Sequence, residues 1–469
     1  MTRLLLCVML SWSSAGLVAC RASLPEPRLP LVATPTDSRP TAPDVEPMAP
    51  PAFPTVRGMT RPGGTLWYVA DHRLSPLVVR VQTRRGDDGA YPTGLVDLTT
   101  TVLAETLDDR LGRGRASSGV NAHGAYLEVR SSNEELPATL EALASVLDGP
   151  PPDAETIDPI RSRVLELLEN ANEDPLSASR VAALDEIKGR EADIDEGMRQ
   201  WRSVFRGYDV DVVDACRRER FAADDRVVIV AGRIEVPRML EAFESHFGGE
   251  REAMARKEAP PFAERTPEHA ALSRPMSLPQ AYVVFARPAP PPTAEEVDDH
   301  LVGQTVLGGT FGSRLNGSLR ETHSYTYGAH AYLGASEGVD VLYIQSAFHP
   351  PDVEDAVRDL FAQLRSVRSD PFSEREITAA RTRIWSHLAA RLEGNGLAGV
   401  LAQAWNMGLA PMTLEQRYHA LEELTGDQLL AVARERFDPH RGILVITGDF
   451  REIGGLYVER TSAGFRLRD

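Results

Sequence analysis

The sequence predicts an α+β protein that contains two copies of one α/β unit. The order of strand and helix patterns in the first half recurs in the second half. Each half also ends with a buried-type strand that runs into glycine, at Arg226–Gly232 and at Gly442–Gly448. In each half, a proline-containing turn separates two helices, at Pro152 and at Pro371. A duplication with a repeat of about 190 residues explains the length better than two unrelated domains.

In the first half, short runs of β-branched and aromatic residues predict strands, and apolar residues three or four positions apart predict helices. The predicted strands are Trp67–Ala70, Leu77–Thr83, Ala125–Val129 and Arg226–Ala231. The predicted helices are Gly94–Leu107, Leu136–Leu147 and Ile157–Asn170. Together they form a predicted N-terminal domain, residues 57–249.

The same patterns define the second half. The predicted strands are Ala281–Phe285, Val339–Ala347 and Gly442–Thr447. The predicted helices are Val297–Leu307, Val353–Val367 and Glu374–Leu392. They form a predicted C-terminal domain, residues 280–469, and a connector rich in proline and charge, residues 250–279, joins the two domains.

Charge and cysteine content exclude several classes of function. The net charge of −17 disfavours nucleic acid as a partner, because no basic stripe offsets the repulsion from phosphates. The three cysteines are Cys7, Cys20 and Cys216, so the folded body contains at most one thiol. One thiol can form neither an internal disulfide framework nor a cysteine-based zinc site.

The N-terminus predicts a lipid anchor. Residues 1–20 contain an early arginine, an apolar run and Leu17-Val18-Ala19-Cys20, which resembles a bacterial lipobox with Cys20 as the lipidated residue. The alternatives are a plain cleaved signal or a short buried helix. The sequence therefore predicts a protein attached to a membrane of the bacterial envelope through Cys20. The outer membrane, on its periplasmic side, is favoured because Arg21 rather than Asp follows this cysteine.

Residues 21–56 form a predicted Pro-rich linker, with ten prolines between Pro25 and Pro54. In polyproline II conformation this segment reaches on the order of 90 Å, so it is a suitable spacer from a membrane surface. The alternative is a disordered tail without a spacer role.

A series of short motifs resembles one family of peptidases. The second half contains, in order, Leu307-Gly308-Gly309, Ser313-Arg314-Leu315, Leu319-Arg320-Glu321 and Tyr327. The first half contains Val69–His72, Val78–Gly86 and Gly94-Leu95. In spacing and order these motifs are similar to those of the pitrilysin/insulinase family of zinc metallopeptidases, the inverzincins, which includes the mitochondrial processing peptidase. The resemblance covers about residues 60–455 and implies two homologous domains, each a mixed, mainly antiparallel sheet packed with helices.

The resemblance also locates the position of the family's zinc site. In active members, the helix after the Gly-Leu pair carries HxxEH, in which two histidines bind zinc and the glutamate acts as general base. The corresponding residues here are Asp97, Thr100 and Thr101. Threonine hydroxyls are poor zinc ligands, and Thr100 cannot act as a general base. We therefore expect no metal and no catalytic residue at this degenerate site, even if Glu173 corresponds to the family's third ligand.

The resemblance implies that Arg320 and Tyr327 contact substrate. A guanidinium can bind a peptide carbonyl, and a phenol can donate to a developing oxyanion. The alternative is structural: Arg320 in an ion pair with Glu321, and Tyr327 as a core residue with a bonded hydroxyl. Tyr325 is a second candidate, which lies on the same face as Tyr327 if the segment is a strand.

These observations predict a protein that is not an enzyme on its own. In this family, chains that lack the zinc motif but retain the arginine and tyrosine often pair with a zinc-bearing chain. The leading hypothesis is a non-catalytic, substrate-binding subunit of a two-chain zinc metallopeptidase, whose partners are a homologous zinc-bearing subunit and a peptide. The alternatives are a stand-alone pseudopeptidase that binds peptides or scaffolds a complex, and a self-sufficient peptidase with an unrecognised site.

Overall fold

A computed structural model describes most of the chain after residue 48. The described residues are 49, 51–84, 94–121, 124–171, 174–188, 202–250, 271–289, 297–336, 339–393, 396–406, 408–410, 416, 419–449, 457–461 and 464–468. The predicted signal peptide, its lipidation site Cys20 and most of the predicted linker lie outside the described residues, so these assignments stay predictions. None of the described helices is both long enough and apolar enough to span a membrane.

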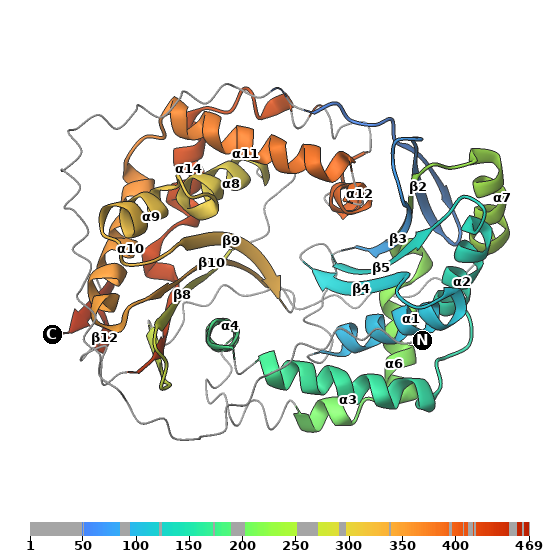
Figure 1. Ribbon diagram of the computed structural model, residues 1–469, viewed down its shortest axis with the longest axis horizontal. Coiled ribbons are helices and arrows are strands. Elements are labelled where there is room, and N and C mark those ends of the chain that lie inside the picture. The colour runs from blue at the N-terminus through green and yellow to red at the C-terminus, as the bar shows by residue number, and fades with distance from the viewer. Residues whose placement is uncertain are drawn as a thin grey trace, which may run out of the picture. The chain divides into compact units, whose positions relative to one another are not determined.

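The first half forms a six-stranded sheet in the order β1-β2-β6-β3-β5-β4 (Figure 1). Its strands are β1 (Arg57–Arg61), β2 (Gly64–Ala70), β3 (Leu77–Thr83), β4 (Ala116–Asn121), β5 (Gly124–Ser131) and β6 (Arg226–Gly232). The β2–β6 pair is parallel and the other pairs are antiparallel. Strands β3 and β6 are buried along their whole length, which means that both faces of the sheet centre are covered.

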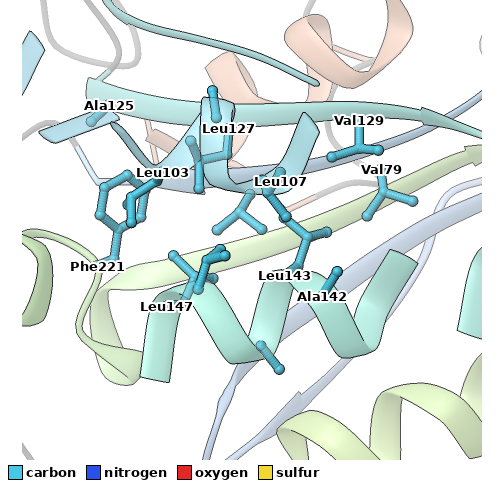
Figure 2. Close-up of a cluster of buried hydrophobic side chains, with 14 of the residues drawn as sticks. Val79, Leu103, Leu107, Ala125, Leu127, Val129, Ala142, Leu143, Leu147 and Phe221 are labelled. Carbon is cyan, nitrogen blue, oxygen red and sulfur yellow. The ribbon is translucent and has the colours of Figure 1, made fainter. Parts of the chain in front are cut away.

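Helices of the first half pack on one face of this sheet. They are α1 (Leu95–Leu111), α2 (Leu136–Asp148), α3 (Ala154–Ala171), α6 (Val210–Arg220) and α7 (Val236–Phe247), with the short turn η2 (Ala223–Asp225) before β6. Figure 2 shows Leu103 and Leu107 of α1 beside Leu143 and Leu147 of α2, below the sheet residue Leu127. All five side chains are nearly inaccessible to solvent. Leucines four positions apart on each helix therefore produce the apolar faces that form this core.

The second half repeats the topology of the first. Its sheet has the order β7-β11-β8-β10-β9, with strands β7 (Ala271–Pro275), β8 (Ala281–Pro288), β9 (Ala329–Ser336), β10 (Val339–Phe348) and β11 (Ile443–Gly448). The β7–β11 pair is parallel and the other pairs are antiparallel, as in the order β2-β6-β3-β5-β4 of the first sheet. The predicted α+β fold of two duplicated, mainly antiparallel units is confirmed.

The second core is built in the same way as the first. Its elements are α8 (Val297–Gln304), the π-helical turn η3 (Thr305–Gly309), α9 (Arg314–Asn316), the π-helical turn η4 (Gly317–Thr322), η5 (Pro350–Asp352), α10 (Val353–Ser369), α11 (Glu374–Glu393), α14 (Gly426–Arg436) and η6 (Pro439–Arg441). Leucine, isoleucine and phenylalanine side chains of these helices and of β8 and β10 form one buried cluster. Near the C-terminus, β12 (Tyr457–Thr461) and β13 (Gly464–Arg468) pair as an antiparallel hairpin.

Each half contributes one helix to the opposite sheet. Helix α12 (Leu397–Asn406) of the second half packs with Trp67, Val78 and Ile229 of the first sheet in one buried cluster. Helix α4 (Pro175–Ile187) of the first half packs on β8, β10 and β11. Its Ser179 hydroxyl lies 2.8 Å from that of Thr447, and both residues are fully buried. The two halves therefore share two hydrophobic cores.

Polar contacts support the same exchange of helices. The Arg84 guanidinium, which follows β3, lies 4.7 Å from the ring centroid of Trp405 in α12. Arg180 of α4 donates a 3.0 Å hydrogen bond to the Tyr332 hydroxyl of β9. Separating the halves would break these contacts and expose both shared cores.

A buried ion pair joins three parts of the first half. Arg226, at the start of β6, donates to both carboxylate oxygens of Asp148 at 2.8 and 2.7 Å. Its remaining donors bond the carbonyls of Gly63 and Phe221 at 3.0 and 2.9 Å. The Arg226 side chain is completely buried, so the Asp148 carboxylate and the two carbonyls offset part of the cost of removing this charge from water.

The structure adds edge strands that the sequence patterns do not predict. Strand β7 lies inside the predicted connector 250–279, which therefore ends before residue 271. The five-residue strand ends in proline. The flanking sequence is rich in proline and charged residues, so the short apolar pattern of the strand is hard to recognise. Strands β1, β4 and β9 are likewise outer or near-edge strands of mixed composition. The predicted boundaries of the two domains at residues 57–249 and 280–469 stay predictions.

Candidate functional site

The residues at the degenerate zinc positions are engaged within their own helix. Gly94 takes a left-handed conformation (φ 79°) at the N-terminus of α1, and Asp97 is exposed in the first turn. The Thr100 hydroxyl donates to the Asp97 backbone carbonyl at 3.0 Å, and the Thr101 hydroxyl donates to the same oxygen at 2.7 Å. Hydrogen bonds of this kind, to a carbonyl three or four residues earlier, are a common way for a helical threonine to bond.

This set of donors does not fit a zinc ion. Protein zinc sites use imidazole, thiolate and carboxylate ligands. Of the three residues, only Asp97 has such a group, and each threonine hydroxyl already donates its proton to a carbonyl. Within the described ranges, no group of three or more His, Cys, Asp or Glu residues is placed to hold a metal. The predicted third ligand, Glu173, lies outside the described residues.

The substrate-binding candidates lie in the connection that differs most between the two halves. Residues 112–115 join α1 to β4 in the first half, whereas residues 310–328 join η3 to β9 in the second. The backbone leaves helical geometry at Gly308, where a Cβ atom would lie 2.7 Å from both the Cβ and the amide nitrogen of Ala331. A glycine is therefore required for η3 to pack this closely on β9.

Arg320 lies on η4 and stacks on an aromatic ring. Its guanidinium carbon is 4.6 Å from the ring centroid of Phe311, and its Nε atom is 3.6 Å from a carboxylate oxygen of Glu321. The Arg320 side chain is 37% exposed and Phe311 is 68% exposed. The structural alternative of an Arg320–Glu321 pair is therefore present as a surface pair, which on its own contributes little to stability.

Tyr327 projects into solvent from an ordered turn. Its side chain is 90% exposed, so the alternative that Tyr327 is a core residue is wrong. The turn is held by Thr326, whose hydroxyl and the Gly328 amide are 3.1 Å apart, and by Ser346 of β10, whose hydroxyl donates to Thr326 at 2.8 Å and to the Gly328 carbonyl at 3.0 Å. The backbone on both sides of Tyr327 is thus fixed, although the side chain itself is almost fully exposed.

Tyr325 is more buried than Tyr327. Residues 324–328 form a loop rather than a strand, with Ser324 in the left-handed region (φ 58°), so the expected common face is wrong. Tyr325 packs against the second core, and its ring stacks on His323 with 5.1 Å between centroids. Burial raises the pKa of Tyr325, and the nearby carboxylates of α10 and η5 raise it further. Tyr325 is therefore less accessible to a substrate than Tyr327.

Asn316 joins the two ends of the 310–328 connection, and the sequence motifs did not identify it. Its amide nitrogen donates to the carbonyls of Thr310 and Ala329, both at 2.8 Å, and to the Ser313 hydroxyl at 3.2 Å. Its amide oxygen accepts a 2.8 Å hydrogen bond from the Ala329 backbone. Asn316 is only 2% exposed, and all its bonds are local to this connection. It fixes the segment that carries Phe311 against the start of β9.

Comparisons with known proteins agree with this architecture. Residues 208–384 match the family model described as the Peptidase M16 inactive domain. An uncharacterized zinc protease of Mycobacterium tuberculosis is 24% identical over 426 residues, which cover 85% of this chain and 95% of that protein.

Solved structures with low sequence identity share the fold. A protease from Helicobacter pylori superposes with a TM-score of 0.70 at 13% identity, over 85% of this chain and 100% of the other. The periplasmic protease PqqL from Escherichia coli gives a TM-score of 0.67 at 12% identity, over 88% of this chain but 47% of PqqL. The duplicated fold and the match of residues 208–384 to the M16 inactive domain confirm the predicted resemblance to the pitrilysin/insulinase family of peptidases, and the chain has Asp97, Thr100 and Thr101 where active members carry the HxxEH motif.

Proposed function

We propose that this chain is the non-catalytic, substrate-binding subunit of a two-chain insulinase-like zinc metallopeptidase at the bacterial envelope. The observation that carries the proposal is an asymmetry between the halves. In the first half, the hydroxyls at the zinc-motif positions bond to the Asp97 carbonyl of their own helix. In the second half, Arg320 and Tyr327 are exposed and have donor groups to offer.

In the proposed complex, the zinc belongs to a homologous partner chain. Arg320 donates hydrogen bonds to a carbonyl of the bound peptide, which fixes the position of the scissile segment. Tyr327 donates its phenolic proton toward the oxygen on which negative charge develops. Arg320 and Tyr327 would thus complete an active site whose zinc is bound by the partner chain.

The size of a related protein supports a two-unit assembly. This chain matches about half of PqqL, a periplasmic protease, at 47% of that chain. A partner of similar size would supply the equivalent of the other half. The lipobox-like sequence ending in Cys20 and the proline-rich segment after it support attachment to an envelope membrane.

Purification of the native protein with its partners tests the proposal. We expect a homologous HxxEH-containing chain to accompany it, and the reconstituted pair to cleave peptides in a zinc-dependent manner. Tyr327→Phe should lower kcat about 10- to 100-fold, because it removes a donor used in the transition state. Arg320→Ala should raise KM about 10-fold, because it removes a hydrogen bond to the bound peptide. An Arg238→Ala variant, which changes an exposed arginine of α7, is the matched control.

Two results would contradict the proposal. If no HxxEH chain accompanies the native protein, a stand-alone pseudopeptidase becomes the better description. If the pair cleaves peptides but Arg320→Ala leaves kcat and KM unchanged, the role of this residue is refuted, whereas the two-chain assembly is not.

A further inference from the structure

We propose that Phe311 is the specificity-determining residue of this surface, and that it selects peptides carrying a large apolar side chain next to the carbonyl bound by Arg320. The inference rests on the proposed function, since it names the substrate class of the same site. It begins with the exposure of Phe311, which is 68%, and of Tyr327, which is 90%. Both belong to the 310–328 connection, and exposed aromatic rings beside an arginine are typical of binding surfaces.

The stacking geometry leaves Arg320 ready to donate. A guanidinium stacked on a ring presents one face to that ring, while its N–H groups lie in its plane and remain free to bond elsewhere. The Nε atom of Arg320 forms an ion pair with a carboxylate oxygen of Glu321 at 3.6 Å. The two terminal nitrogens can therefore serve a peptide carbonyl, directly beside the ring of Phe311.

The surface is also held in place before any ligand arrives. Asn316 bonds the carbonyl of Thr310, the residue before Phe311, and both backbone groups of Ala329. Because this amide is buried and fully bonded, the position of the Phe311 segment relative to β9 is set by the fold. A preorganised surface loses less conformational entropy on binding than a flexible loop does.

The neighbouring charges favour a peptide over a nucleic acid. Glu321 lies next to Arg320 with its side chain 65% exposed, and Asp355 is exposed on α10. These carboxylates and the net charge of −17 would repel a phosphate backbone. The carboxylates do not repel an uncharged backbone carbonyl or an apolar side chain. An extended peptide therefore suits this surface better than a nucleic acid does.

The test measures binding of two sets of fluorescent peptides to the full chain. One set consists of ten polar decapeptides, each with a single Phe at a different position, which covers every register. The reference set consists of the same ten polar decapeptides, each with Ala in place of the single Phe. We expect the best Phe peptide to bind about 10-fold more tightly than its Ala reference, since one apolar side chain discriminates by this order.

Three variants and one control variant separate the contributions. Phe311→Ala should bring the ratio of affinities for the Phe peptide and its Ala reference close to 1, and Phe311→Trp should keep this ratio near that of the wild type. Arg320→Ala should weaken both peptide sets equally. Leu167→Ala, which changes a residue of α3 that is 60% exposed, should change neither.

The outcomes distinguish the inference from the proposed function. If Arg320→Ala weakens binding but Phe311→Ala retains the preference for Phe, the inference is overturned and the proposed function stands. If the wild-type protein binds no peptide of either set, both are overturned. Tighter binding of single-stranded DNA than of any peptide would also overturn the inference.

Discussion

The exchange of helices between the two halves predicts that one substitution in α12 will destabilise the whole fold. Leu401 of α12 is fully buried in the cluster that also contains Trp67, Val78 and Ile229 of the first sheet. Leu401→Ala would leave a cavity between a helix of one half and a sheet of the other. Neither half can close this cavity without losing contacts with the other.

The expected magnitude follows from the burial of the side chain. Replacing a fully buried leucine by alanine lowers the free energy of unfolding by 2–5 kcal/mol, depending on how far the surroundings relax. We expect a loss of about 3 kcal/mol, since the cavity wall formed by β2, β3 and β6 is part of a six-stranded sheet that cannot readily collapse.

Equilibrium unfolding in guanidinium chloride measures the effect. Trp67 and Trp405 are both buried in the affected cluster, so tryptophan fluorescence reports on it, while circular dichroism reports on both halves. The two probes should give one coincident transition that moves to lower denaturant concentration. Leu167→Ala, at an exposed site, should change the free energy by less than about 0.5 kcal/mol. Two separate transitions, of which only one moves, would refute the idea of shared cores.

Three further predictions concern stability. Arg226→Met should lower the free energy of unfolding by about 2–3 kcal/mol, because it removes a completely buried guanidinium that donates to the Asp148 carboxylate and to the carbonyls of Gly63 and Phe221. Gly308→Ala should destabilise the fold because its Cβ atom would meet β9, whereas Gly317→Ala, with no atom within 4 Å, should be tolerated. Hydrogen bonds from Arg73 lower the pKa of Asp71 from the usual value of 3.8 to about 2. A group with a depressed pKa stabilises the fold above its unfolded pKa, so Asp71→Asn should be less stable than wild type near pH 6, and denaturation curves should show this difference disappearing as the pH falls from about 4 to 2.

The centre of each sheet could be predicted from the sequence because burial on both faces leaves a clear pattern. Strand β6 is a continuous apolar run after Arg226, β11 repeats this pattern, and β3 is rich in valine although it also contains Arg80, Gln82 and Thr83. Strands β4 and β9 are at sheet edges and contain Ser, Gly and Asn or His. Edge strands are partly exposed, so their sequences need not alternate, and they could not be recognised in this way.

The exchange of α4 and α12 could not be predicted either. Helix α12 carries apolar residues on most of its surface, such as Leu397, Val400, Leu401 and Trp405, and such a helix must be buried. The sequence of the helix does not indicate on which of the two sheets it packs. Both sheets have apolar faces that can cover a helix, so the choice depends on the tertiary structure.

The site was predicted only where a motif marked it. Arg320 and Tyr327 stand in motifs with family-like spacing, and the structure places both at the surface of one connection. Phe311 and Asn316 were missed because neither type of residue is distinctive in sequence. A single Phe among glycines is usually a core residue, and an Asn in a turn usually serves the local backbone. Only the stacking on Arg320 and the four bonds of the buried amide reveal their roles.

The two copies of the unit differ where function is proposed. In the first copy, α1 is a regular helix, and a short connection, residues 112–115, leads from it to β4. In the second copy, the equivalent helix breaks into a π-helical turn at Gly308, and the longer connection 310–328 precedes β9. π-Helical turns inside helices are frequent at functional sites. The break and the longer connection bring Phe311, Arg320 and Tyr327 to the surface, whereas the regular helix retains hydroxyls that are bonded to its own backbone. The duplication has thus kept one fold, while among the described residues the proposed binding groups lie in the second copy. Under the proposed function, a second chain would supply the zinc chemistry.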